Sequence, residues 1–338
     1  MQPVITIQNL RVGYSGKDRE KPLEVLKGFS TEVNSGDFIA LIGRNGSGKS
    51  TLLRSLARQQ HVLEGTLLLN KKPYQNISRH EFSRLVSFVS TENLHVPHMT
   101  VYELVSLGRF PYTNWFGKLT AEDHHLVQKA IHNVGISHLG HRPINKISDG
   151  EKQRAVIART LAQDTDIMIL DEPTAFLDLP NRYEIYQLLH QLSRNTGKAV
   201  ILSTHDLNMA LFEADKLWIL NQHNIVEGAP EDLVLKGEID DLIENSQLHF
   251  DKKTGNFRMK KTLTGKLNLV GKGIIYHWTA KALERIGFYI DPSSNQTITA
   301  LKENDIYKWI YKDNVQEIDF YSIYDLSLYL NNIKPFRP

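Results

Sequence analysis

The sequence predicts an α/β fold over residues 1–240, followed by a small α+β domain over residues 250–338. Short apolar runs alternate with helical patterns in the first part, which is typical of a largely parallel sheet with helices on its faces. A glycine-rich loop stands between the apolar run at residues 38–42 and a helical pattern that starts at Leu52. After about residue 240 the composition shifts toward Tyr, Lys, Asn and Ile, and this shift places the domain boundary.

Apolar runs bounded by polar or turn-forming residues define the strands of the first domain. In chain order they are residues 4–10, 38–42, 66–70, 85–89, 167–170, 199–203, 216–220 and 225–227. Helical periodicity predicts helices over residues 100–108, 120–134, 181–194 and 206–213. Because the stretch at about residues 92–160 has few strand signals, we expect a helical subdomain there, inserted between the two halves of the sheet.

The second domain is apolar enough to fold, and the same criteria apply to it. They predict strands at residues 266–270, 297–301, 306–311 and 316–320, and helices at residues 279–286 and 323–332. Trp278, Trp309 and the many tyrosines suit a ligand pocket, a core or an interface. A regulatory ligand-binding domain and a dimerisation domain therefore remain open, with dimer contacts slightly favoured.

Composition excludes several classes of protein. The formal net charge of the 338 residues is +2, so nucleic acid is not an obvious partner. The absence of cysteine excludes disulfides, thiolate metal sites and cysteine nucleophiles. The N-terminus lacks the pattern of a secretory signal, and no apolar run approaches the roughly 20 residues of a membrane-spanning helix. A membrane role would therefore require a partner chain.

The glycine-rich loop matches the phosphate-binding pattern G-x-x-x-x-G-K-[ST]. Its glycines let backbone N–H groups turn toward an anion, and the following helix directs the positive end of its dipole there. Lys49 supplies a cation for the β- and γ-phosphates, and the Ser50 hydroxyl is placed to ligate Mg²⁺. The predicted nucleotide-binding residues are Gly43, Arg44, Asn45, Gly46, Ser47, Gly48, Lys49, Ser50 and Thr51.

Polar side chains at the ends of two predicted strands indicate hydrolysis of the bound nucleotide. Asp171 and Glu172 end an apolar strand, where Asp171 is placed to hold Mg²⁺ and Glu172 to act as general base toward water. His205 follows the next strand, at a place from which a histidine can reach a γ-phosphate. Lys49, Glu172 and His205 are therefore the predicted catalytic residues.

Residues 147–154, Ile-Ser-Asp-Gly-Glu-Lys-Gln-Arg, resemble the signature motif of ATP-binding cassette (ABC) proteins, usually L-S-G-G-Q. Ser148 and Gly150 are retained, whereas Asp149 and Glu151 depart from the pattern. The resemblance covers roughly residues 1–240, with several motifs in the same order. It implies a P-loop ABC ATPase that binds ATP and Mg²⁺. It also implies a head-to-tail homodimer, in which Ser148 and its neighbours cap the ATP held by the other copy.

The same resemblance assigns further positions. Tyr14 matches the aromatic residue that stacks on adenine, Asp178 matches the D-loop at the dimer interface, and His205 matches the switch histidine. One position departs, because Thr91 and Glu92 stand where the family has a glutamine that contacts Mg²⁺ and the lytic water. Glu92 is then a possible Mg²⁺ ligand in its place, and Thr91 a weaker one.

Residues 99–112 and 115–123 resemble the permease-facing segment of importers for ferric siderophores, haem and cobalamin, with the ferric-siderophore branch most similar. This resemblance implies an ATPase that drives uptake of an iron complex from the cytoplasmic face of the membrane. Its implied partners are permease subunits and an external substrate-binding protein. The alternatives are a haem or cobalamin importer, and a soluble ABC ATPase acting on nucleic acid or ribosomes, which the near-neutral charge disfavours.

Histidines are frequent in the same region. A metal site is one interpretation, but an iron complex passes through the permease without touching the ATPase. We therefore expect surface side chains at His124, His125, His132, His138 and His141.

Overall fold

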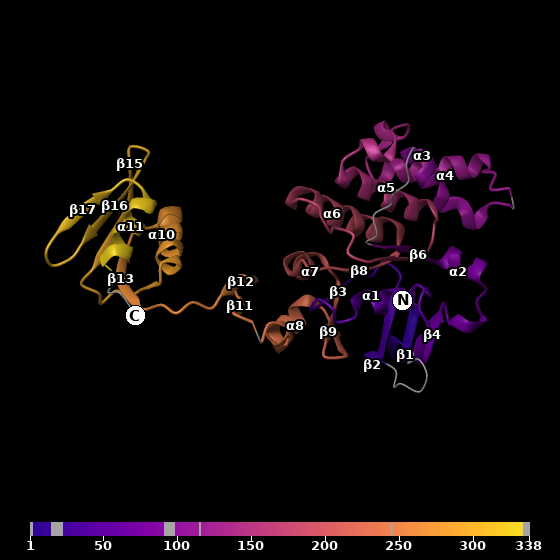
Figure 1. Ribbon diagram of the computed structural model, residues 1–338, viewed down its shortest axis with the longest axis horizontal. Helices are drawn as coiled ribbons and strands as arrows, with labels where there is room; N and C mark the ends of the chain where they lie inside the picture. Colours follow the sequence, from indigo (N-terminus) through magenta and orange to yellow (C-terminus); the bar gives the residue numbers. More distant parts are fainter. Residues whose placement is uncertain (1–2, 15–22, 91–98, 115, 245, 334–338) are drawn as a thin grey trace. The chain divides into compact units, whose positions relative to one another are not determined.

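The computed structural model describes residues 3–14, 23–90, 99–114, 116–244 and 246–333 (Figure 1). The chain forms two compact units. The first comprises Met1–Ser246 with Phe250–Phe257, and the second comprises Gln247–His249 with Arg258–Pro338. The chain passes between them just before β11 (Leu248–Asp251), within β11, and within β12 (Asn256–Met259).

A six-stranded sheet forms the centre of the first unit. Its strand order is β10-β9-β3-β8-β7-β6, and every pairing is parallel except the one between β10 and β9. β7 and β8 are buried along their whole length, which explains their continuous apolar sequences. The strands are β3 (Phe38–Gly43), β6 (Val86–Val89), β7 (Ile167–Leu170), β8 (Ala199–Ser203), β9 (Lys216–Asn221) and β10 (Asn224–Gly228).

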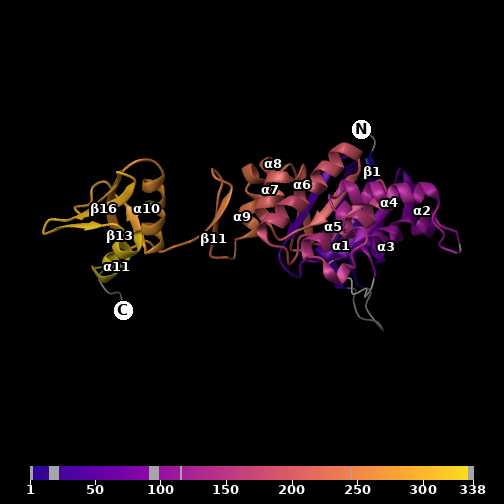
Figure 2. The same ribbon diagram turned by 90° about the horizontal axis from the view of Figure 1, so that it is seen from above.

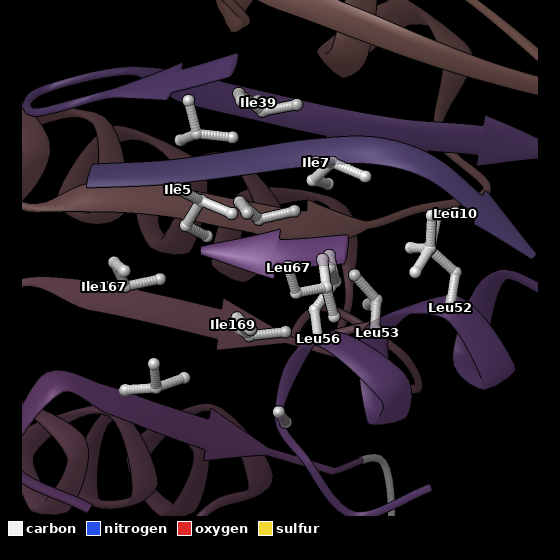
Figure 3. Close-up of a cluster of buried hydrophobic side chains, with 14 of the residues drawn as sticks. Ile5, Ile7, Leu10, Ile39, Leu52, Leu53, Leu56, Leu67, Ile167 and Ile169 are labelled. Atoms are coloured by element: carbon white, nitrogen blue, oxygen red, sulfur yellow. The ribbon is translucent and has the colours of Figure 1, made fainter. Parts of the chain in front are cut away.

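A second, antiparallel sheet has the order β2-β1-β4-β5. It consists of β1 (Pro3–Tyr14), β2 (Leu23–Asn34), β4 (Val62–Leu69) and β5 (Lys72–Pro73). Between the two sheets, Ile5 and Ile7 of β1 meet Ile39 of β3 and Ile167 of β7, together with leucines of α1 (Lys49–Leu56) (Figure 3). The helix that follows the glycine-rich loop is thereby anchored in the main core.

Helices flank the main sheet. Short elements between β5 and β6 are η1 (Tyr74–Asn76) and α2 (Arg79–Leu85). The helical subdomain packs α3 (Val101–Ser106), α4 (Ala121–Asn133) and α5 (Asp149–Ala162) against one another, near one end of the unit in Figure 1. Its 3₁₀ turns are η2 (Leu107–Tyr112), η3 (Ser137–Leu139) and η4 (Ile144–Lys146). The remaining helices are α6 (Leu179–Thr196), α7 (Leu207–Glu213), α8 (Pro230–Lys236) and α9 (Glu238–Leu242).

A buried ion pair joins the elements of the helical subdomain. Arg109 Nε donates to Asp123 Oδ1 at 2.8 Å, and the Arg109 guanidinium also donates to Ala162 O at 2.9 Å. Both side chains are only 6% exposed. Burial raises the pKa of Asp123, but hydrogen bonds from Thr120 and the charge of Arg109 outweigh it and lower the pKa to about 2.

We predict that Asp123→Asn lowers the free energy of unfolding by about 3–5 kcal/mol, because it leaves a buried guanidinium without its counter-charge. Since the folded-state pKa of Asp123 is depressed, its contribution is present above the ordinary carboxyl value of about 3.9. It is lost as the pH falls through about 2. Urea denaturation at pH 7 followed by circular dichroism measures the change, with exposed Glu122→Gln as the control. Equal losses in the two variants would refute the prediction.

The second unit is a five-stranded sheet of order β14-β13-β15-β16-β17, with two helices (Figure 2). α10 packs on β13, β14 and β15, while α11 packs on β16, β17 and α10. Trp309 lies in this core, where its Nε1 donates to Thr279 Oγ1 at 2.7 Å, and Trp278 is 64% exposed. The elements are β13 (Gly265–Val270), α10 (Gly273–Arg285), β14 (Phe288–Ile290), β15 (Thr297–Glu303), β16 (Ile306–Lys312), β17 (Glu317–Phe320) and α11 (Ile323–Ile333).

Several predicted elements differ from the structure. α10 begins at Gly273, six residues before the predicted start at 279, and β4 begins at Val62, four residues before the predicted start at 66. The predicted helix at 100–108 is α-helical only to Ser106, after which a 3₁₀ turn accommodates Pro111. The prediction contained no strand at β2 or at β14. In β2 the consecutive exposed residues Lys27 and Gly28 interrupt the alternation of buried and exposed positions that would indicate a strand.

In the part of the chain that the structure describes, no helix combines the length and the apolar character that spanning a bilayer requires.

Candidate functional site

The glycine-rich loop connects β3 to α1. Gly46 and Gly48 have φ angles of 75° and 103°, in the left-handed region that glycine adopts without strain. A Cβ atom on Gly48 would lie 1.7 Å from Cγ1 of Val25, so any side chain at this position would force Val25 to move. Because Gly48 is the N-cap of α1 and carries no capping side chain, the first N–H groups of the helix are available to an anion.

Lys49 points back across the loop. Its Nζ donates to Gly43 O at 3.0 Å and to Arg44 O at 3.3 Å, and the residue is 5% exposed. Burial lowers the pKa of Lys49, while the carboxylates of Glu172 and Asp171 act in the opposite direction. The ammonium is therefore held over the loop, close to the two carboxylates that end β7.

Asp171 is the best candidate for a metal ligand. It is 1% exposed, and its Oδ1 accepts hydrogen bonds from Ser50 Oγ at 3.1 Å and Ser203 Oγ at 2.7 Å. Its Oδ2 is buried and has no hydrogen-bond partner among the described residues. An unpartnered carboxylate oxygen beside a hydroxyl is the oxygen donor set that Mg²⁺ takes from proteins. The residues present thus fit a magnesium ion that also contacts phosphate.

Glu172 lies next to Asp171 with an unusual backbone. Its φ of 48° is in the left-handed region, and its N–H donates to Ser203 Oγ at 2.8 Å. Such a conformation costs of order 1 kcal/mol and persists only where neighbours hold it. Glu172 Oε1 lies 2.6 Å from His205 Nε2. The ends of β7 and β8 therefore bring Asp171, Glu172 and His205 together, as expected for neighbouring parallel strands.

Ser203 was not among the predicted site residues, although it connects two of them. Its hydroxyl donates to Asp171 and accepts from the Glu172 backbone, which orients both acidic residues. The available signal was a polar side chain at the end of the buried apolar run Val200-Ile201-Leu202.

The signature residues surround the start of α5. Ser148 is the N-cap of this helix and forms a capping box with Glu151. Gly150 packs against α6, because a Cβ on it would lie 2.7 Å from Asn181 Oδ1. Asp178 is the N-cap of α6, and its Oδ1 accepts from Asn181 N at 3.1 Å and Asn181 Nδ2 at 2.6 Å. Asn181 thus hydrogen-bonds to Asp178 of the D-loop position and packs against Gly150 of the signature.

Among the described residues, no hydrogen bond or ion pair joins Ser148 or Asp178 to the phosphate loop. Tyr14 is 50% exposed, and its hydroxyl lies 3.1 Å from Thr51 Oγ1, at the edge of the loop. Thr91 and Glu92 lie outside the described residues.

The five histidines of the helical subdomain do not point toward a common metal site among the described residues. All five predicted surface histidines are exposed, and His124 hydrogen-bonds and stacks on Tyr102. Within residues 3–14, 23–90, 99–114, 116–244 and 246–333, no group of three or more His, Asp or Glu side chains is arranged to hold a metal ion.

Comparison with known proteins identifies the family. The ABC transporter family model matches residues 26–175. The chain is 32% identical over 258 residues to the uncharacterized ABC transporter ATP-binding protein MJ0873 of Methanocaldococcus jannaschii, covering 76% of this chain and 87% of that protein. The chain belongs to the ABC transporter family. The match to the achromobactin transport ATP-binding protein CbrD of Dickeya dadantii is 37% over 231 residues, covering 68% and 84% of the two chains.

Solved ABC structures share the fold. The ABC cassette of MJ0796, a dimeric bacterial structure, superposes with a TM-score of 0.58 at 26% identity over 67% of this chain and 98% of that one. The cbiO1 protein of Clostridium perfringens superposes with a TM-score of 0.62 at 27% identity over 72% and 96%. The chain is therefore an ABC ATPase, and the predicted P-loop fold class is confirmed.

A second family model, the iron ABC transporter C-terminal domain, matches residues 264–331. This match lies in the second unit of the ABC ATPase, and it covers all of its sheet and both of its helices except Asn332 and Ile333.

Proposed function

We propose that this ABC ATPase drives import of an iron complex, such as a ferric siderophore, through separate permease subunits. The match of the second unit to the iron ABC transporter C-terminal domain is the observation that carries the proposal. Relatives named as achromobactin and ferric enterobactin transport ATP-binding proteins, 37% and 38% identical, support it. The ABC ATPase lies at the cytoplasmic face of the membrane, bound to the permease, and an external binding protein delivers the complex.

In this proposal each residue of the site has a role. Backbone N–H groups of residues 43–51 bind the phosphates, and Lys49 neutralises the charge on the β- and γ-oxygens. Ser50 and Asp171 hold Mg²⁺, which when bound screens the phosphate charge. Glu172 accepts the proton of the attacking water, and His205, 2.6 Å from Glu172, holds its carboxylate in position. Tyr14 stacks on adenine.

A second copy completes the site. The signature motif supports a head-to-tail homodimer, in which each signature faces the ATP of its partner. Among the described residues, no hydrogen bond joins Ser148 or Asp178 to the phosphate loop of the same chain, which fits this arrangement. Closure of this dimer moves the helical subdomain, and the attached permease follows. In that subdomain Leu107, Phe110 and Phe116 are 48%, 73% and 89% exposed, which suits an apolar contact with a permease.

The test is uptake by the reconstituted transporter. The ATPase is combined with its permease subunits in vesicles, and ATP-dependent entry of a labelled ferric siderophore is measured against haem and cobalamin. We expect the ferric complex to enter, and no entry with the Glu172→Gln variant. Preferential entry of haem or cobalamin would replace the proposed substrate, and co-purification with RNA in place of a permease would contradict the transport role.

A further inference from the structure

The carboxylate of Glu151 occupies the donors at the start of α5. Its Oε2 accepts hydrogen bonds from Ser148 N at 2.8 Å and from Ser148 Oγ at 2.9 Å. In return, Glu151 N donates to Ser148 Oγ at 3.3 Å. A serine hydroxyl has a single proton to donate, so the Ser148 hydroxyl gives it to Glu151 in the separate chain.

The surroundings keep this carboxylate ionised. The backbone N–H of Ser148 and then its hydroxyl lower the pKa of Glu151, and His138 and Arg142 of the helical subdomain add a smaller electrostatic effect in the same direction. Asp149, the first residue of α5, is 74% exposed and pairs with Lys152 at 2.8 Å. The positive end of the α5 dipole therefore already faces two carboxylates of its own chain.

This arrangement conflicts with the task of the signature. In the proposed dimer the Ser148 hydroxyl would face the γ-phosphate of the partner's ATP, and that hydroxyl donates to Glu151 in the separate chain. Hydrogen bonds to an ionised acceptor are roughly twice as strong as neutral ones, so releasing them is costly. A carboxylate at this place also repels the triphosphate.

We propose that Glu151 is a positioning residue that fills the phosphate-binding donors of the signature in the separate chain and is displaced when the ATP of a second copy arrives. The inference rests on the proposed dimeric function. The displaced carboxylate turns toward the positive charge of Arg142, which already acts on it in the separate chain. When the dimer closes, the γ-phosphate of the second copy's ATP therefore replaces the Glu151 carboxylate at the signature. This replacement raises the ATP concentration that closure requires.

The same capping geometry occurs at two other helices of the helical subdomain. Two other capping boxes in the helical subdomain, Thr100 with Glu103 and Thr120 with Asp123, contain the same reciprocal hydrogen bonds. For Thr100, the bonds from N and Oγ to Glu103 Oε2 are both 2.8 Å. The Thr100–Glu103 box is thus a matched control, because it has equal local geometry and belongs to α3 instead of the signature helix.

The experiment measures ATP-driven dimerisation by light scattering in the full chain carrying Glu172→Gln, which retains ATP. Adding Glu151→Gln keeps the capping box but removes the charge, since glutamine also caps at this position. We expect half-maximal dimerisation at a roughly tenfold lower ATP concentration, because one charge is removed beside the triphosphate. Glu103→Gln in the same background should leave the ATP concentration unchanged.

A second variant separates an effect on stability from an effect on the ATP requirement. Glu151→Ala removes the carboxylate and its capping bonds, so it should lower the melting temperature and still lower the ATP requirement. An ATP requirement that is unchanged or raised in both Glu151 variants would overturn the inference while leaving the dimeric function intact. Failure of the Glu172→Gln chain to dimerise at any ATP concentration would instead contradict the proposed function, and the inference with it.

Discussion

Replacing Lys49 by alanine is expected to reduce the rate of ATP hydrolysis by about a hundredfold or more, the loss typical when a preorganised charge on the transition state is removed. The ammonium is held over the phosphate loop by the carbonyl groups of Gly43 and Arg44. In the proposed mechanism this ammonium neutralises charge as the γ-phosphate leaves. Steady-state phosphate release, with nucleotide affinity measured separately by a fluorescent ATP analogue, reports both effects.

Lys27→Ala is the matched control for this prediction. Lys27 lies exposed on β2, so its replacement removes the same charge from the chain without touching the loop. Its ATPase rate should remain near that of the unmodified chain. Full activity and tight nucleotide binding in Lys49→Ala would contradict the assignment of the loop.

Replacing Glu172 by glutamine is expected to slow hydrolysis by roughly a hundredfold to ten-thousandfold while ATP still binds, the range attributed to a general base. An amide cannot accept the proton of the attacking water at neutral pH. The change preserves size and keeps the backbone hydrogen bond from Glu172 to Ser203, so folding should be unaffected. The retained ATP should shift the chain toward a closed dimer, measured together with single-turnover hydrolysis.

The control is Glu231→Gln, an exposed position on α8. It changes the net charge equally and should not alter either the turnover rate or the dimer population. Normal steady-state hydrolysis in Glu172→Gln would remove this residue from the catalytic role and leave His205 or Asp171 as the group to test.

Much of the site could be predicted because its residues lie at the ends of strongly apolar strands. The predicted strands at 167–170 and 199–203 coincide with β7 and β8, so the positions of Asp171, Glu172 and His205 followed from the strand ends. Asn181 and Ser203 were not predicted, because an isolated polar residue acquires its role only from neighbours in other segments. The roles of the site residues stay predictions until the variants are measured.

The sequence by itself determined the class of the protein, the order of its motifs and the residue types of the nucleotide site, because strand periodicity and loop spacing are local properties. Only the tertiary structure decided which donors are occupied. It showed that one oxygen of Asp171 accepts two hydroxyl groups while the other has no hydrogen-bond partner among the described residues. It also showed that Ser203 of β8 donates to Asp171 and accepts from the Glu172 backbone, so that a neighbouring strand orients both acidic residues. A motif specifies which groups are present, whereas the directions of their hydrogen bonds depend on the packing of several elements around them.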